Sequence, residues 1–228
     1  MTTLTPDRSE QALGQIAVEL PGATAVFRRL KLDFCCGGQI ALATACANKG
    51  LDLEAVCAEL ATLDRPDTQD APAEPSVLIE HILERYHAVH RQQLPELIRM
   101  ARRVEAVHRD HPDVPAGLAD HLETMQDELL DHMEKEEQIL FPLMLGGSAP
   151  ATQYPTQAMR HEHTGHGDLL DKLMAMTGDA TPPAGACNTW RALYSGIAQL
   201  QNDLIHHIHL ENNLLFPHFE PSENNCCA

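Results

Sequence analysis

Apolar residues recur at three- and four-residue spacing along most of the chain, a pattern typical of amphipathic α-helices. Four long segments carry it, at residues 77–109, 115–145, 153–177 and 185–217, and Pro or Gly breakers separate them. No segment alternates like a strand. Helices of this length with short connections predict an all-α fold built on an antiparallel four-helix bundle. Pro95 lies inside the first segment and predicts a kink or a break there.

Shorter helical patterns fill residues 10–63, before a polar, proline-rich stretch at residues 65–76 that reads as a linker. The sequence therefore predicts a small helical domain at 1–64, a linker at 65–76, the bundle at 77–220 and a tail at 221–228.

Charge and cysteine usage narrow the classes of function. The chain of 228 residues has 33 acidic and 16 basic residues and a formal net charge of −17. Such a surface repels phosphate backbones and anionic membranes, so we expect neither nucleic-acid nor membrane binding. A signal-peptide core and a run of about 20 apolar residues are both missing, which favours a cytoplasmic protein. Seven cysteines, two pairs of them adjacent, do not resemble a secreted disulfide framework.

Histidine and glutamate occupy core positions on two of the predicted helices. The segment HHIHLENNLLFP (206–217) superposes without a gap on DHMEKEEQILFP (131–142). His132 and Glu136 therefore correspond to His207 and Glu211, and each pair interrupts an apolar stripe. Residues four apart on a helix converge on one point. A buried carboxylate is protonated, paired or bound to metal, and the second and fourth stripes carry no Lys or Arg, so a metal is the better interpretation.

The first and third helices each offer two further candidates, His87 or His90 and His163 or His166, and periodicity does not choose between them. One histidine from each helix gives four imidazoles and two carboxylates. These six ligands are more than the four that one tetrahedral zinc ion binds, and they suit two octahedral metal ions bridged by the carboxylates. Mixed imidazole and carboxylate ligation favours iron, with manganese as the main competitor.

Several of these segments together resemble a known family. The segments are RYHAVHRQQLPEL (85–97), HMEKEEQILFP (132–142), the Glu162-His163 pair, HHIHLENNLLFP and LDFCCGGQIALATACANKGLD (32–52). They resemble the repair-of-iron-centres (RIC) family, which has a hemerythrin-like bundle and a small ScdA-type Cys-Cys domain.

The resemblance implies a ligand set and a cofactor. The cofactor would be two non-haem iron ions per chain, oxo-bridged when oxidised. The implied ligands are His87, His132, Glu136, His163, His207 and Glu211, with both glutamates bridging. Oxygen-carrying hemerythrins have a fifth histidine where this chain has Gly167. That departure argues against oxygen carriage and for open positions on the iron.

The resemblance also implies a function in the nitrosative and oxidative stress response. The expected activity is nitric oxide binding at reduced iron together with repair of iron–sulfur and other iron centres, with damaged iron–sulfur proteins as iron acceptors. One alternative is a nitric oxide reductase that forms nitrous oxide, and another is an oxygen-binding or oxygen-sensing hemerythrin. The oligomeric state stays open between monomer and dimer.

Cys35 and Cys36 precede two glycines and a helix expected to begin at Gln39. A helix N-terminus lowers the pKa of nearby thiols, so we expect a reactive pair. The resemblance implies that this pair transfers nitrosyl groups, iron or electrons. Cys226 and Cys227 in the tail receive no role.

Overall fold

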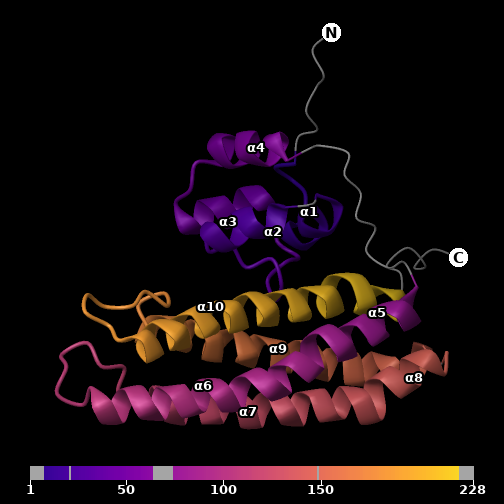
Figure 1. Ribbon diagram of the computed structural model, residues 1–228. Helices are drawn as coiled ribbons and strands as arrows, with labels where there is room; N and C mark the ends of the chain where they lie inside the picture. Colours follow the sequence, from indigo (N-terminus) through magenta and orange to yellow (C-terminus); the bar gives the residue numbers. More distant parts are fainter. Residues whose placement is uncertain (1–7, 21, 64–73, 148, 221–228) are drawn as a thin grey trace, which may run out of the picture.

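Helices make up most of the chain in a computed structural model, which describes residues 8–20, 22–63, 74–147 and 149–220. Within these ranges there is no strand, only an isolated bridge between Ala12 and Ala41. The predicted all-α fold, an antiparallel bundle preceded by a small helical unit, is confirmed (Figure 1). Most of the predicted linker and the whole tail with Cys226 and Cys227 lie outside the described residues.

The N-terminal unit has four short helices: α1 (Leu13–Glu19), α2 (Ala23–Arg29), α3 (Leu42–Lys49) and α4 (Leu53–Thr62). They enclose an apolar cluster that includes Phe27 and Phe34. The Asp52 side chain caps α4 by accepting the N–H of Glu54. The helix expected from Gln39 begins only at Leu42, so that prediction is wrong by most of a turn. A turn and a bend occupy residues 37–40 instead.

The bundle consists of four long helical stretches, three of which contain a wide π turn. Their parts are α5 (Pro75–Ile82), η1 (Leu83–His87) and α6 (Ala88–Val107); α7 (Leu118–Lys135), η2 (Glu136–Leu140) and α8 (Phe141–Leu145); α9 (Ala149–Met176); and α10 (Asn188–His209), η3 (Leu210–Leu215) and η4 (Phe216–His218). Pro95 lies inside α6 without ending it, so of the predicted kink or break the break does not occur. The first stretch begins at Pro75, slightly before its predicted start.

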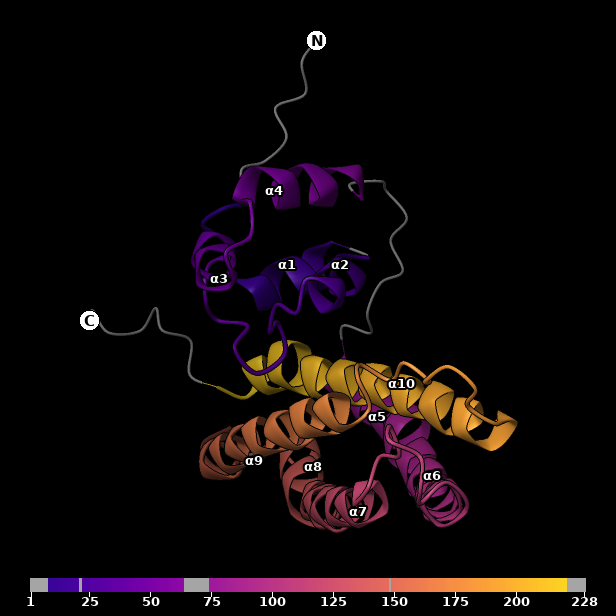
Figure 2. The same ribbon diagram turned by 90° about the vertical axis from the view of Figure 1, so that its left-hand side faces the viewer.

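Consecutive helices run antiparallel, and the four occupy the corners of a square (Figure 2). α6 packs against α7 and α10, and α7 also packs against α9. Helices α6 and α9 are therefore at opposite corners, as are α7 and α10. None of the helices in the described ranges is both long enough and apolar enough to cross a membrane.

Two apolar clusters divide the interior of the bundle along its length. The larger cluster fills the part that contains Leu97, Leu122 and Trp190. Gly196 lies in this part, and a Cβ there would come within 2.6 Å of Leu97 Cδ2, so the Leu97 side chain would have to shift. The smaller cluster closes the other end around Phe141 and Phe216. Between the two clusters lies a buried layer of histidine and glutamate.

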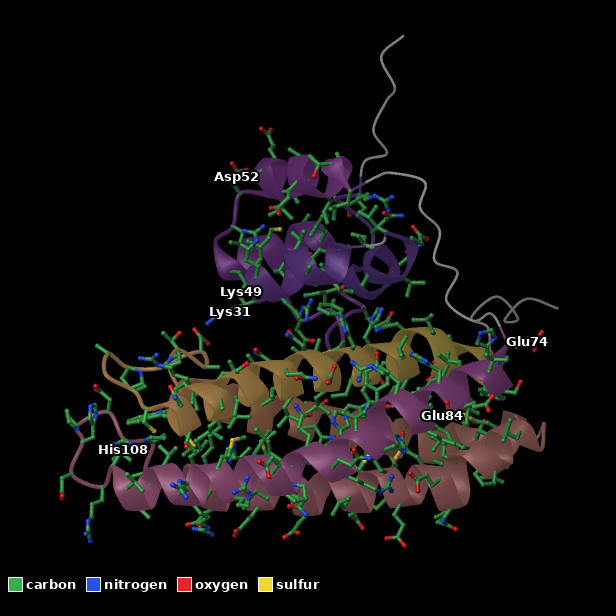
Figure 3. The ribbon with its side chains drawn as sticks, viewed as in Figure 1. Lys31, Lys49, Asp52, Glu74, Glu84 and His108 are labelled. Atoms are coloured by element: carbon green, nitrogen blue, oxygen red, sulfur yellow. The ribbon has the colours of Figure 1, made fainter. Side chains whose placement is uncertain are left out.

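The N-terminal unit rests on the side of the bundle formed by α10 (Figures 1 and 2). Arg28 donates to Asn202 Oδ1 at 2.5 Å, and Lys31 forms an ion pair of 2.9 Å with Asp179 at the edge of the contact (Figure 3). Asn213 Nδ2 also donates to the carbonyl of Phe34, at 3.3 Å. These three contacts are polar, and each part has its own apolar core.

A chain shortened to begin at Glu74 should therefore fold alone, because both apolar clusters of the bundle consist mainly of bundle residues. We expect high helical content and a single cooperative thermal transition by circular dichroism. Broad, non-cooperative melting of the shortened chain, beside a sharp transition of the full chain, would contradict independent folding of the bundle.

Candidate metal centre

Six buried side chains from the four long helical stretches form two overlapping groups of four. One group is His87, Glu136, His207 and Glu211, and the other is His132, Glu136, His163 and Glu211. Within each group the potential ligand atoms all lie within 4.8 Å of one another. Both glutamates belong to both groups, which is the arrangement expected of bridging carboxylates. The structure thus brings together all six ligands that the family resemblance implied.

The spacing of the donor atoms fits metal coordination. His132 Nε2 lies 3.1 Å from His163 Nε2, and His87 Nε2 lies 3.1 Å from His207 Nε2. Glu211 lies 3.0 Å from His207 Nε2 through one oxygen and 3.1 Å from His163 Nε2 through the other. Ligands at right angles around a metal with bonds of about 2.1 Å lie about 3.0 Å apart. Each group therefore has room for one ion among its four donors.

The π turns coincide with these ligands. His87 ends the turn Leu83–His87, Glu136 begins the turn Glu136–Leu140, and Glu211 lies in the turn Leu210–Leu215. A π turn adds one residue to a helical turn and often marks a functional site. No sequence pattern predicted these turns, although Pro142 and Pro217 follow two of them and lack the N–H of a regular helix.

Of the four histidines in the two groups, three form a hydrogen bond through Nδ1, the ring nitrogen that faces away from the centre. His87 Nδ1 lies 2.7 Å from Glu137 Oε1, His132 Nδ1 lies 3.0 Å from Glu162 Oε2, and His163 Nδ1 lies 2.9 Å from Asn212 Oδ1. All three partner atoms are acceptors, so each Nδ1 carries the proton and each Nε2 presents a lone pair inward.

The outer partners are themselves fixed in position. Arg91 holds Glu137 through two contacts of 2.8 and 3.0 Å, and Lys135 Nζ lies 2.7 Å from Glu162. Sequence reasoning missed Glu137, Glu162 and Asn212 as supports. Each directly neighbours a ligand in the sequence, which is the only signal that could have suggested them.

The inward lone pairs suit a bound metal ion. His132 Nε2 and His163 Nε2 face each other at 3.1 Å, and a Glu211 oxygen lies equally close to His163 Nε2. A proton can bridge only one such contact, whereas a metal ion satisfies all the donors at once. Glu136 has both oxygens buried without a hydrogen-bond partner. The donor set therefore fits two imidazole-and-carboxylate metal positions.

Burial governs the pKa values in this layer. Burial, and then the neighbouring Glu211, raises the pKa of Glu136 well above its usual value. Burial would also raise the pKa of Glu211, but His207 and His163 outweigh it and hold that pKa well below the usual range. Burial lowers the pKa values of His87 and His132 to about 4, so both imidazoles are neutral at pH 7 and available to a metal.

His90 and His166, the alternatives that periodicity left open, lie outside both groups although both are buried. Their ring centroids are 5.4 Å from His207 and 4.7 Å from His132, respectively. Burial lowers their pKa values to about 2 and about 3, so both are neutral imidazoles.

The Cys35-Cys36 pair lies against the bundle next to a proposed ligand. Cys36 Sγ lies 3.4 Å from the carbonyl of His163, and Asn212 Nδ2 donates to the carbonyl of Cys35 at 2.9 Å. Asp33 accepts the N–H groups of Cys36 and Gly37 at 2.9 and 2.8 Å and shapes this loop. With Asp33 the two thiols form a third group that could hold a metal ion.

The expected activation of these thiols by a helix N-terminus is wrong for Cys35. No helix begins at Gln39, and the hydrogen bond that the Cys35 thiol donates to Cys36, burial and the nearby Asp33 together raise the pKa of Cys35 far above its usual value. The glycines serve the tight turn, because a Cβ on Gly38 would lie 2.4 Å from the carbonyl oxygen of Phe34.

Comparisons with known proteins agree with this architecture. The family described as "Hemerythrin HHE cation binding domain" matches residues 78–219, and ScdA_N, a "Domain of Unknown function (DUF542)", matches residues 9–64. The iron-sulfur cluster repair protein YtfE of Dickeya chrysanthemi is 48% identical over 211 residues, which cover 91% of this chain and 96% of that protein.

Proteins of the same name from other bacteria are equally similar. YtfE of Escherichia coli O157:H7 is 48% identical over 210 residues, which cover 91% of this chain and 96% of that protein. YtfE of Cronobacter sakazakii is 49% identical over 210 residues, with 91% and 95% covered. Because the similarity spans both helical units at this level of identity, the chain belongs to the YtfE family of iron-sulfur cluster repair proteins.

Proposed function

We propose that the protein holds two non-haem iron ions and supports the repair of damaged iron–sulfur and other iron centres in the cytoplasm. The proposal of a metal centre rests on one observation: two buried groups, each of four potential ligands, share Glu136 and Glu211. The names of the relatives support the repair function. The proposed ligands are those that the family resemblance implied, and the mixed imidazole and carboxylate donors favour iron over zinc.

Nitric oxide is the proposed small-molecule partner. Each proposed iron has four protein donors, two imidazoles and one oxygen of each glutamate, whereas an octahedral ion takes six. Bound iron in the reduced state would supply affinity for nitric oxide at the remaining positions. The apolar clusters on both sides keep bulk water away from these positions.

Iron transfer would pass through the Cys35-Cys36 loop. Cys36 touches the backbone of His163, and Asn212 joins the backbone of Cys35 to the ring of the same histidine. The group formed by Asp33, Cys35 and Cys36 can accept an ion that leaves the His132–His163 position. The proposed acceptors are damaged iron–sulfur proteins.

Reduction of nitric oxide is a second candidate function. The shared glutamates place the two proposed metal positions side by side, so two nitric oxide molecules can bind next to each other. Their coupling with two electrons and two protons gives nitrous oxide and water. Anaerobic addition of nitric oxide to the reduced protein, with nitrous oxide and released iron both quantified, separates the two functions. Catalytic amounts of nitrous oxide would favour the reductase.

Metal content tests the proposed centre directly. We expect two irons per chain by elemental analysis after anaerobic purification from iron-replete cells. His87→Ala and His163→Ala should each lose iron, because each removes one of four donors from one position. Glu136→Ala and Glu211→Ala should deplete both positions, because each carboxylate is shared.

The matched controls for ligand loss are His90→Ala and His166→Ala, which remove equally buried imidazoles outside both groups and should keep most of the iron. Iron loss in these controls but not in His87→Ala and His163→Ala would reverse the assignment. A single zinc per chain in the wild type would sink it altogether.

Thiol function is tested separately from metal binding. The double variant Cys35→Ser/Cys36→Ser should keep its iron and its nitric oxide binding, because neither thiol belongs to the shared groups. It should fail to restore cluster-dependent growth in a repair-deficient strain under nitrosative stress. Cys46→Ser, a buried thiol inside α3, is the control and should rescue. Full rescue by the double variant at equal expression would remove the pair from the mechanism.

A further inference from the structure

Two buried histidines have ring nitrogens without partners. Both ring nitrogens of His90 and Nδ1 of His166 are buried with no hydrogen-bond partner among the described residues. The two side chains are almost inaccessible, at 0% and 5% exposure. A buried polar group left unsatisfied costs about 1–3 kcal/mol, so such a pair calls for a ligand.

The directions of the helices place both histidines on the same side of the proposed metal positions. His90 follows His87 by one turn on α6, and His166 follows His163 by one turn on α9, which runs in the same direction. Three residues correspond to a shift of about 4.5 Å along the bundle.

The two carboxylates are shifted the opposite way. Glu136 follows His132 and Glu211 follows His207, and both pairs lie on stretches that run against α6 and α9. The glutamates therefore flank one face of the four imidazoles, and His90 and His166 flank the other.

The second face carries apolar side chains beside the two histidines. Helices α6 and α9, which carry His90 and His166, occupy opposite corners of the bundle (Figure 2), so the two histidines reach this face from different helices. Leu129 and Leu204, one turn before His132 and His207, hold the other two corners and belong to the larger apolar cluster. A ligand there must be small, because apolar side chains already pack on this face. The two imidazoles would give it polar contacts besides the metals.

We propose that His90 and His166 form a binding site for a small anion or diatomic molecule on the face of the metal pair opposite the carboxylates. The site rests on the proposed metal centre. Each neutral imidazole offers one N–H to a lone pair of the ligand, and hydrogen bonds in such dry surroundings are strong. The two histidines are positioning residues that select ligands with accepting atoms and hold them against the metals.

Azide is a suitable probe, because it is a small anion whose binding to ferric iron changes the visible absorption. The double variant His90→Leu/His166→Leu should keep two irons per chain but bind azide at least tenfold more weakly, about 1.4 kcal/mol. The single variants should fall in between. His90→Gln/His166→Gln, which keeps N–H donors, should regain part of the affinity.

The matched control is His121→Leu, the same change at a buried histidine of α7 whose Nε2 bonds the carbonyl of Leu169 at 2.8 Å, away from the site. It should leave azide binding unchanged. Azide affinity within twofold of wild type in an iron-loaded double leucine variant would overturn the proposal. Loss of iron from both double variants would also overturn it, by making the histidines ligands. If elemental analysis of the wild-type protein found fewer than two metal ions per chain, the proposed metal centre would be contradicted before any azide is added.

Discussion

The structure depends on the burial of two carboxylates between two apolar clusters, with no Lys or Arg among the described residues paired to either of them. Glu136 and Glu211 are fully inaccessible, and the charged side chains near this layer already pair with other groups. Isolated carboxylates in such a place would be strongly destabilising. The proposed metal ions would remove that cost, and inward imidazole lone pairs would supply the rest of the coordination. Folding of the bundle and loading with metal would then be thermodynamically linked.

The groups behind the ligands give the site its orientation. Glu137 fixes His87 across the contact between the α6 and α7 stretches, and Glu162 fixes His132 across the contact between α7 and α9. Each glutamate is held by a basic side chain at the surface. Asn212 has a different role, because it joins a ligand histidine to the backbone of the N-terminal unit. The Cys-Cys loop thus contacts one of the two proposed metal positions, through His163 and Asn212.

Much of the fold and of the candidate metal centre could be predicted from the sequence, because the periodicity of a helix is a local property of the chain. The spacing of His132 with Glu136 and of His207 with Glu211 placed four ligands on core stripes before any tertiary information. Periodicity could not choose between His87 and His90, since both point into the core and differ only by one turn along the axis. The supports Glu137 and Asn212 are defined by contacts between helices that no local pattern encodes. The start of α3 at Leu42 and the raised pKa of Cys35 were missed because loop packing and Asp33 decide them.

The wide turns at Glu136–Leu140 and Leu210–Leu215 change the register of the helices that carry the carboxylates. A regular helix advances about 100° per residue, and a π turn absorbs one extra residue before the regular ladder resumes. In each of these helices, the residues before the π turn that face the larger cluster and the residues after it that face the smaller cluster follow different helical registers. Glu136 and Glu211 lie where the register changes. Deleting a single residue from either turn would restore an ordinary helix and swing Phe141 or Phe216 off the core. Phe141 and Phe216 cover the carboxylates because each of these helices contains one residue more than a regular α-helix of the same length.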